Sequence, residues 1–379
     1  MTALPTIDLF AGAGGLSLAA ATVGCDVVLH VDSDPIACET IRANPRHHQG
    51  LVLQADIAEV DGTRLRSIAG LDKKDPLLVI GGPPCQPFSK AAFWSEDGDD
   101  AAFRRARARG EHAARPAAHS HRADTRRFLV EDYTRLVVDA EADGFVFENV
   151  ASLAAPRNRH MLDRLLSAAH AAGYQTTLVR ADAVEFGAPQ RRSRIFVLGA
   201  KATAPVEPIP THALRPEKHP GRLPAATTGP ALAPFLGREH AEDEEIVTGR
   251  WAEHLRTVPP GGNYKAHTEW GGHPEPTFVT ETRYWNFLLK LSPDLPSWTI
   301  AASPGPWTGP FHWESRRLRT VEMAALQTFP YGYKFSGSRR ARVRQIGNAA
   351  PPVLAAPMIA ATLASIKSAR HRAPAVLAA

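Results

Sequence analysis

The sequence predicts an α/β protein with a mainly parallel sheet that helices cover on both faces, followed by a small irregular domain. Short apolar runs alternate with segments of helical periodicity through the first 200 residues, and strands joined by helical crossovers pair in parallel. A glycine-rich turn directly follows the first run. The composition changes beyond residue 200: residues 201–234 contain eight prolines, and residues 251–313 contain six of the seven tryptophans.

The predicted strands are short, apolar and bounded by turn residues. We expect them at residues 6–10, 27–31, 51–53, 77–80, 145–147, 174–179 and 195–198. Helical periodicity lies between them at residues 16–23, 35–44 and 159–172. Proline occupies the first position of the second helix, and Gly173 follows the third, as is usual at helix ends.

Composition narrows the class of protein. The chain of 379 residues has a net charge of +5 and a pI of about 9.2, which permits a polyanionic partner. Its cysteines Cys25, Cys38 and Cys85 form no Cys-x-x-Cys pair, which argues against a disulfide framework or a cysteine zinc site and for a reducing compartment. We expect no signal peptide, and we expect residues 349–365 to be too short and too proline-rich to span a membrane. We expect a soluble, cytoplasmic protein without a metal or a membrane.

The stretch VIGGPPCQPFSK (79–90) places a cysteine directly after a buried strand. Open α/β sheets bind ligands at the carboxyl ends of their strands, and two prolines before Cys85 leave the loop little freedom. The thiol is therefore a candidate nucleophile. A buried structural cysteine is the alternative, but the flanking glycines and prolines are poor core sequence.

The turn FAGAGG (10–15) indicates a nucleoside site. Glycine has no side chain, so a ligand can approach the backbone closely. Asp32 follows Gly12 by 20 residues at the end of the second strand, where a carboxylate can accept hydrogen bonds from ribose hydroxyls. The spacing lacks the third glycine of the dinucleotide fingerprint. A plain tight turn is the alternative.

Two further polar groups lie near strand ends. Glu148 is on the same expected sheet edge as Cys85, and a carboxyl group withdrawn from water can keep a proton and hydrogen-bond a ring nitrogen and an exocyclic amine. A solvent-facing strand end is equally compatible with its position. The basic run QRRSR (190–194) can contact phosphates or a carbonyl oxygen, or form ordinary surface charge.

Five segments, in this order, resemble the motifs of the DNA (cytosine-5) methyltransferases: DLFAGAGG (8–15), PPCQPFS (83–89), ENV (148–150), QRRSR (190–194) and QIGNAAPP (345–352). The resemblance covers about residues 6–200 and 295–365. It implies a Rossmann-like, S-adenosylmethionine-dependent methyltransferase sheet. The implied domains are a catalytic and cofactor-binding domain at 1–200, a target-recognition domain with a proline-rich linker at 201–290, and a C-terminal segment at 291–379 that returns to the catalytic domain.

The resemblance also implies a reaction. The Cys85 thiolate adds to carbon 6 of a flipped-out cytosine, Glu148 steadies nitrogen 3 and the exocyclic amine, and carbon 5 takes the methyl group of S-adenosylmethionine. The implied catalytic residues are Cys85, Glu148, Arg192 and Arg194, with the two arginines at the cytosine carbonyl and the neighbouring backbone. The implied cofactor-binding residues are Phe10, Gly12, Gly14, Gly15, Asp32, Asp56, Ile57, Pro83 and Asn348. The implied DNA-binding residues are Gln86, Ser89, Asn149 and Arg192.

Three features depart from the family pattern. The segment between Ser89 and Asp124 is longer and richer in arginine, and its tract 104–127 either settles over DNA phosphates or forms a solvated loop. The tripeptide 124–126 reads Asp-Thr-Arg where Asp-Pro-Arg is usual. Arg319 replaces the usual threonine, which leaves the contact between the two lobes open.

We therefore expect a site-specific DNA cytosine-5 methyltransferase that acts on double-stranded DNA as a monomer, with a cognate restriction endonuclease as a further candidate partner. A transfer-RNA methyltransferase of the same fold is one alternative, although the aromatic-rich segment favours DNA. A nicotinamide-dependent oxidoreductase leaves Cys85 and Glu148 unexplained. A binding module that has lost catalysis is hard to reconcile with both residues being intact.

Overall fold

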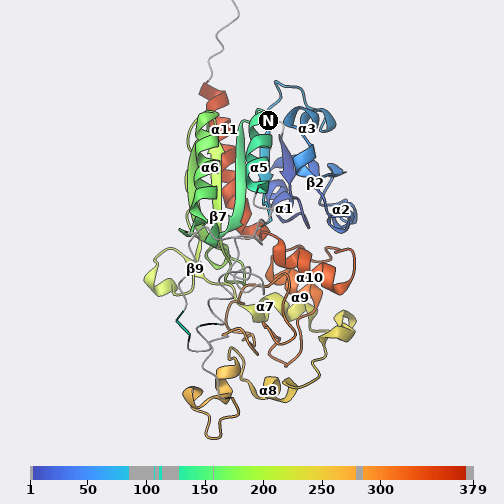
Figure 1. Ribbon diagram of the computed structural model, residues 1–379, viewed down its shortest axis with the longest axis vertical. Helices are drawn as coiled ribbons and strands as arrows, with labels where there is room; N and C mark the ends of the chain where they lie inside the picture. Colours follow the sequence, from blue (N-terminus) through green and yellow to red (C-terminus); the bar gives the residue numbers. More distant parts are fainter. Residues whose placement is uncertain are drawn as a thin grey trace, which may run out of the picture.

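The computed structural model describes residues 3–84, 106, 111–112, 128–156, 158–278 and 285–372. The sheet and its helices form one lobe, in the upper part of Figure 1, and an irregular lobe of short helices and turns lies below it. Helices α9 (Thr320–Leu326) and α10 (Arg339–Asn348) lie between the two.

The predicted mainly parallel sheet is confirmed. Its strands are β1 (Leu4–Leu9), β2 (Cys25–Asp32), β3 (Leu51–Gln54), β4 (Leu78–Gly81), β5 (Gly144–Val150), β6 (Gln175–Asp182) and β7 (Ser193–Ala200). They lie in the order β3-β2-β1-β4-β5-β7-β6. The pairs among β1 to β5 are parallel, and β7 is antiparallel to both β5 and β6. The strand order reverses between β1 and β4, and a crevice opens at such a switch point.

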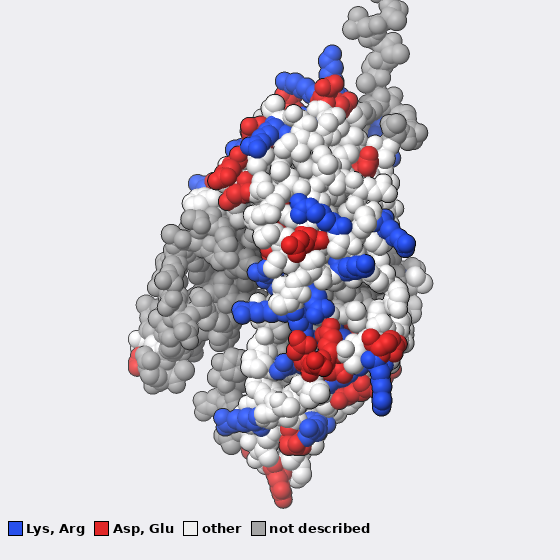
Figure 2. All heavy atoms as spheres, turned by 90° about the vertical axis from the view of Figure 1, so that its right-hand side faces the viewer, with Lys and Arg blue, Asp and Glu red and all other residues white. Residues whose placement is uncertain are grey.

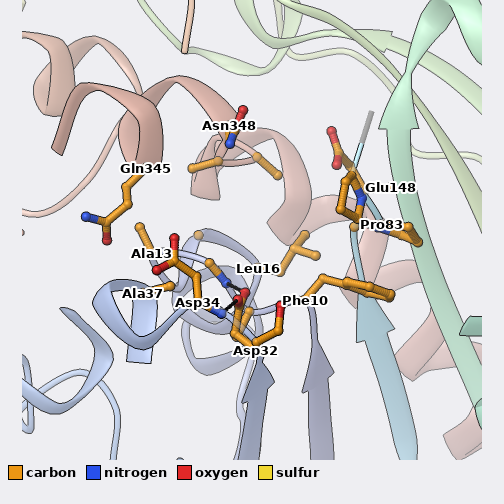
Figure 3. A pocket seen from close by; sticks show the side chains of 18 of the residues that line it. Phe10, Ala13, Leu16, Asp32, Asp34, Ala37, Pro83, Glu148, Gln345 and Asn348 are labelled. Carbon is orange, nitrogen blue, oxygen red and sulfur yellow. Dashed lines mark hydrogen bonds between the residues drawn. The ribbon is translucent and has the colours of Figure 1, made fainter. Parts of the chain in front are cut away.

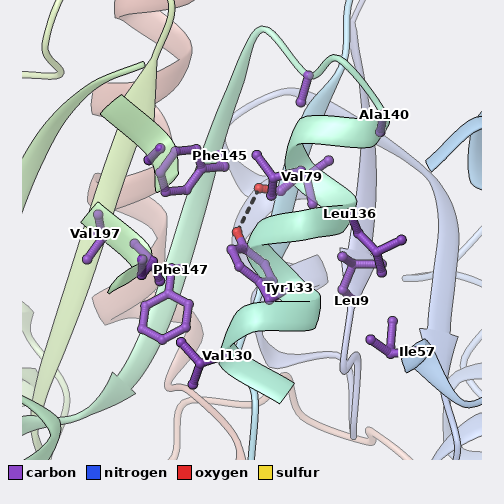
Figure 4. Packing of buried hydrophobic residues seen from close by; sticks show 14 of the residues in the cluster. Leu9, Ile57, Val79, Val130, Tyr133, Leu136, Ala140, Phe145, Phe147 and Val197 are labelled. Carbon is purple, nitrogen blue, oxygen red and sulfur yellow. Dashed lines mark hydrogen bonds between the residues drawn. The ribbon is translucent and has the colours of Figure 1, made fainter. Parts of the chain in front are cut away.

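Helices α3 (Gly62–Ile68), α5 (Leu129–Asp139) and α6 (Arg159–Ala171) cover one face of the sheet. Figure 4 shows Tyr133 of α5 directed at the sheet, where its ring centroid lies 5.4 Å from that of Phe147. Its hydroxyl donates a hydrogen bond of 2.9 Å to the carbonyl of Val146. The sequence predicted α6 but neither α3 nor α5, and α5 supplies much of this core.

Helices α1 (Gly15–Thr22) and α11 (Pro352–Arg372) cover the other face. The stretch Arg339–Ser368 is long and apolar enough to cross a membrane by length and composition, but 61% of its apolar window is buried inside the protein. Leu354, Met358 and Ile359 of α11 are fully buried against the sheet. This helical stretch is longer than the apolar end at 349–365 that the sequence indicated, and its packing identifies it as a core helix of the described chain.

The second lobe has little regular structure, as its composition suggested. It contains β8 (His212–Ala213), β9 (Leu223–Pro224), α7 (Thr228–Leu232) and α8 (Ala252–Thr257). A small apolar cluster that includes Leu255, Leu288 and Phe311 forms its core.

The remaining short elements lie in both lobes. Helix α2 (Pro35–Arg42) belongs to the first lobe. The 3₁₀ turns are η1 (Ile57–Glu59), η5 (Ala151–Ala154), η6 (Ala183–Phe186), η7 (Pro216–Lys218), η8 (Ala233–Phe235), η9 (Arg238–His240), η10 (Asp243–Glu245), η11 (Tyr264–His267) and η12 (Glu269–Gly271).

Arg319 provides the contact between the lobes that its departure from the family pattern had left open. Its side chain is 5% exposed. Its Nε lies 2.5 Å from a Glu245 carboxylate oxygen, and its Nη1 donates to the carbonyls of Phe235 at 2.6 Å and Gly237 at 2.7 Å. The substituted arginine therefore holds the segment 235–245 against the start of α9.

Candidate active site

One pocket lies at the carboxyl ends of β1, β2, β4 and β5, as the strand order predicts. Its volume is about 530 Å³, within the range of small-molecule sites. Figure 3 shows Phe10 and Asp32 at the strand ends, facing Gln345 and Asn348 of α10 across the cavity. The C-terminal segment therefore closes one side of the pocket.

The first turn presents bare backbone to this pocket. Gly12 has a φ of +53°, and beyond its chain neighbours the atom nearest to the position that a Cβ would take is the Phe10 carbonyl oxygen at 3.8 Å, so a ligand can approach here. Its amide donates a hydrogen bond of 2.8 Å to Asp32 Oδ2, and the amide of Asp34 donates one of 2.8 Å to Asp32 Oδ1. Burial raises the pKa of Asp32, although these hydrogen bonds lower it. Asp32 thus braces the turn and retains lone pairs for a ligand.

Gly14 and Gly15 make room for protein atoms. A Cβ on Gly14 would come within 2.6 Å of the His48 ring, and one on Gly15 within 2.4 Å of the Ala350 carbonyl oxygen. Gly15 lines the pocket, whereas Gly14 does not. The φ of +79° and the missing side chain of Gly14 serve the turn and the packing of His48, and its predicted cofactor contact stays a prediction.

The C-terminal segment is bonded to the back of the same turn. The hydroxyl of Tyr333 donates to the carbonyl of Ala13 at 2.6 Å and lies 2.8 Å from His48 Nε2. A phenol has one hydrogen, so His48 donates to Tyr333 through Nε2. Burial lowers the pKa of His48 to about 3, which keeps the ring neutral at pH 7.

Asp34, Asp56, Ile57 and Asn348 also line the pocket. Asp56 caps the turn η1 by accepting a hydrogen bond of 3.0 Å from the amide of Ala58. Asp34 pairs with Arg344 of α10 at 2.6 Å, across the cavity. Asp34, Arg344 and Gln345 were not predicted as site residues. Only Asp34 had a local signal, as an acidic cap before Pro35.

Glu148 lies on the wall of the pocket, paired with Arg194. Arg194 Nε is 2.8 Å from Glu148 Oε1, and both side chains are almost buried. Burial raises the pKa of Glu148, and the charge of Arg194 partly opposes that rise. A Cβ on Gly82 would lie 2.9 Å from Glu148 Oε2, so the glycine lets the backbone before Cys85 pass close to this carboxyl group.

Asn149 is a buried support of that backbone. Its Nδ2 donates a hydrogen bond of 3.1 Å to the carbonyl of Pro83, and the side chain is 1% exposed. Pro83 and Pro84 line the pocket and lead directly to Cys85. Asn149 therefore supports the backbone before Cys85, and its predicted contact with DNA stays a prediction. The predicted residues Cys85, Gln86 and Ser89, and most of the tract 104–127, lie outside the described residues.

Arg192 is bonded to the C-terminal segment. It is 1% exposed, and its guanidinium donates to the carbonyls of Ile300 at 3.1 Å, Gly347 at 2.6 Å and Ala349 at 3.1 Å. Arg194 lines the pocket, whereas Arg192 does not. Arg192 therefore holds the C-terminal segment in place, and its predicted contacts with cytosine and DNA stay predictions.

Comparisons with known proteins decide the family. The C-5 cytosine-specific DNA methylase family model matches residues 4–364. The chain belongs to this family. It is 36% identical to the Type II methyltransferase M.SacI of Streptomyces achromogenes over 92% of this chain and 90% of that one. It is 30% identical to the Type II methyltransferase M1.HphI of Haemophilus parahaemolyticus over 95% and 87%.

Two solved structures share the fold. A prophage-encoded candidate DNA modification methyltransferase of E. coli matches with a TM-score of 0.64 and 20% identity, over 96% of this chain and 100% of that one. The Dnmt2 methyltransferase of S. pombe matches with a TM-score of 0.53 and 15% identity, over 97% and 99%. This DNA (cytosine-5) methyltransferase thus has the Rossmann-like sheet that its motifs predicted.

The cofactor of this enzyme family, S-adenosylmethionine, suits the pocket. Phe10 and Leu16 offer apolar surface, the backbone at Gly12 is open, and the carboxylates of Asp32, Asp34 and Asp56 can meet hydroxyl, amine and ammonium groups. Within the described part of the chain, no group of three or more His, Cys, Asp or Glu side chains is arranged to hold a metal ion.

Proposed function

We propose that this chain methylates carbon 5 of a cytosine within a specific DNA sequence, through a covalent adduct with Cys85 and with the base flipped out of the duplex. The observation that supports this most is the buried Glu148–Arg194 pair, which lies on the pocket wall beside the segment that leads to Cys85. A cytosine inside a duplex cannot reach such a pocket, so the proposed reaction requires the base to be flipped out.

In the proposed reaction a bond forms between the Cys85 sulfur and carbon 6 of cytosine, and the ring electrons move toward nitrogen 3. Glu148 hydrogen-bonds nitrogen 3 and the exocyclic amine; burial favours its protonated form, and Arg194 fixes its orientation. When bound, S-adenosylmethionine would supply a methyl group to carbon 5 and would leave as S-adenosylhomocysteine, which keeps the electron pair of the broken carbon–sulfur bond. Water or hydroxide then removes the proton of carbon 5, the electrons of that bond restore the ring double bond, and the sulfur leaves carbon 6.

We assign the cofactor contacts from the same geometry. Phe10 would face the adenine, Asp32 the ribose, and Asp56 with Ile57 the edge of the adenine. Pro83, Gly12, Gly15 and Asn348 would complete the cofactor site; all of them line the pocket. Asn348 is supplied by α10, so cofactor binding depends on the docking of the C-terminal segment.

The proposal also assigns the residues that would recognise DNA and the partner of the enzyme. Residues 201–290 would form the target-recognition domain, Gln86 and Ser89 would approach the flipped base, and a monomer would act in the cytoplasm. The Type II relatives favour a cognate restriction endonuclease as a functional partner. Basic and acidic side chains of the described residues are interspersed on the face shown in Figure 2.

Trapping tests the covalent step. A cytosine that carries fluorine at carbon 5 cannot release a proton there, so the Cys85 adduct should persist as a protein–DNA band that resists denaturation. The target sequence is first found by bisulfite sequencing of DNA from cells that express the protein. We expect no band and no methyl transfer with Cys85→Ala, while folding and S-adenosylmethionine binding remain. Methylation by Cys85→Ala, or by the wild type on transfer RNA alone, would refute the proposal.

A further inference from the structure

We propose that Arg191, Trp298 and Trp285 form a clamp for the DNA backbone beside the active site, in which Arg191 binds a phosphate and Trp285 packs against the neighbouring deoxyribose. The inference rests on the proposed DNA methylation and assigns a surface that the catalytic and cofactor sites leave unused. We call this row of side chains the backbone clamp.

The three side chains of the backbone clamp lie in contact in a row, with the two indole rings tilted by 60°. Arg191 Cζ lies 4.9 Å from the centroid of the Trp298 ring, and the ring centroids of Trp298 and Trp285 are 4.5 Å apart. Trp285 is 46% exposed. An indole beside a cation offers flat apolar surface next to positive charge, and these two features suit the sugar and phosphate of one nucleotide.

Backbone contacts hold the row in place. The amide of Arg191 donates to the carbonyl of Ser297 at 2.8 Å, and the hydroxyl of Thr299 donates to the carbonyl of Arg191 at 2.7 Å. On the side of the second lobe, Asn263 Nδ2 donates to the carbonyl of Trp285 at 2.6 Å. The clamp is therefore built before DNA arrives and spans both lobes, which lowers the entropic cost of binding.

Arg191 is the arginine of the run 190–194 that is left for a ligand. Arg192 donates to three carbonyls and Arg194 pairs with Glu148. The Nε of Arg191 is buried and has no acceptor among the described residues, and its guanidinium forms no ion pair there. A guanidinium that rests on an indole keeps its in-plane donors, which match a phosphate.

The location agrees with a role on DNA. Arg191 precedes Arg194 by three residues, just before β7 begins at Ser193, and Arg194 lines the pocket. Three residues of fully extended chain span at most roughly 10 Å, and successive nucleotides of one DNA strand rise about 3.4 Å. A strand that delivers its cytosine to the pocket would thus pass Arg191 within about three nucleotides.

Salt-dependent DNA binding tests the clamp. Binding of a fluorescent 30-base-pair duplex of mixed sequence is measured for Arg191→Gln and Trp285→Ala between 50 and 200 mM salt, roughly the range over which phosphate contacts dominate. Loss of one phosphate contact should reduce the slope of log affinity against log salt by about 0.9 for Arg191→Gln. That variant should bind about tenfold more weakly. Trp285→Ala should bind several-fold more weakly with an unchanged slope, because it removes no charge.

A lysine at the opposite edge of the sheet gives the control. Lys73 precedes β4, at the sheet edge opposite the pocket, and its exposed side chain pairs with Glu141 at 2.7 Å. Lys73→Gln should bind DNA like the wild type, and all three variants should keep wild-type affinity for S-adenosylmethionine. An unchanged slope in Arg191→Gln, or an equal loss in Lys73→Gln, would overturn the clamp. Either result would leave the proposed reaction standing if the wild type methylates DNA.

Discussion

Removing the hydroxyl of Tyr333 should weaken cofactor binding indirectly, by loosening the first turn that lines the pocket. This hydroxyl donates to Ala13 in the first turn and accepts from His48, and both partners are buried. Tyr333→Phe leaves a carbonyl and an imidazole N–H without a partner, at a cost of about 1 kcal/mol or more each. We expect a total loss of roughly 2 to 3 kcal/mol in the free energy of unfolding. A turn that is free to move should lower S-adenosylmethionine affinity about fivefold, equivalent to about 1 kcal/mol.

Tyr174 supplies the control. Its buried hydroxyl donates to the carbonyl of Ala142 at 2.7 Å, just before β5 and thus at the sheet edge opposite the pocket. Tyr174→Phe should also destabilise the fold, by about 1 to 2 kcal/mol, without changing cofactor affinity. Calorimetric titration with S-adenosylmethionine and urea unfolding measure both quantities. Equal losses of cofactor affinity in the two variants would show that the effect is general destabilisation, and an unchanged affinity in Tyr333→Phe would refute the positioning role.

Two further predictions concern stability. Arg319→Thr, which restores the usual family residue, should destabilise the protein by about 3 kcal/mol because it leaves Glu245 without its buried partner. Urea unfolding measures this loss. The exposed control Arg159→Ala should show little change, because its pair with Asp163 is solvated. Burial raises the pKa of Asp8 to about 7. Between about pH 4 and 7 the unfolded chain has therefore lost a proton that the folded chain keeps, so the free energy of unfolding falls as pH rises. Asp8→Asn should therefore gain stability relative to the wild type across that window and level off above it; a parallel pH profile for the two proteins would contradict the assignment.

The sheet could be predicted from the sequence because its strands are buried on both faces and read as continuous apolar runs, as at Leu78–Gly81. Helix α5 carried a usable signal, since Val130, Tyr133 and Val137 recur at helical spacing, but it follows the arginine tract and was overlooked. The pocket residues next to glycines and strand ends were likewise recognisable, because the strand order brings those ends together.

The roles of Asn149 and Arg192 could not be read locally. Each has the residue type of a ligand contact and lies in a recognisable motif. In the structure, however, each side chain donates hydrogen bonds to backbone carbonyls from distant parts of the chain. Arg192 bonds to Gly347, 155 residues away, and no periodicity in the sequence reports that contact. Because Arg192 and Arg194 bond within the protein, Arg191 becomes the arginine of this run proposed to bind DNA. Its position in the motif alone did not indicate such a role.

The C-terminal segment emerges as part of the cofactor site as well as part of the fold. Tyr333 bonds to Ala13, the carbonyl of Ala350 occupies the space that a Gly15 side chain would need, and Arg344 pairs with Asp34. These contacts join the first turn to residues more than 300 positions later in the chain. A cofactor that touches Gly12, Asp34 and Asn348 at once would bind only where both chain ends are docked. Its binding free energy is therefore linked to the docking of the C-terminal segment, because any ligand stabilises the state to which it binds.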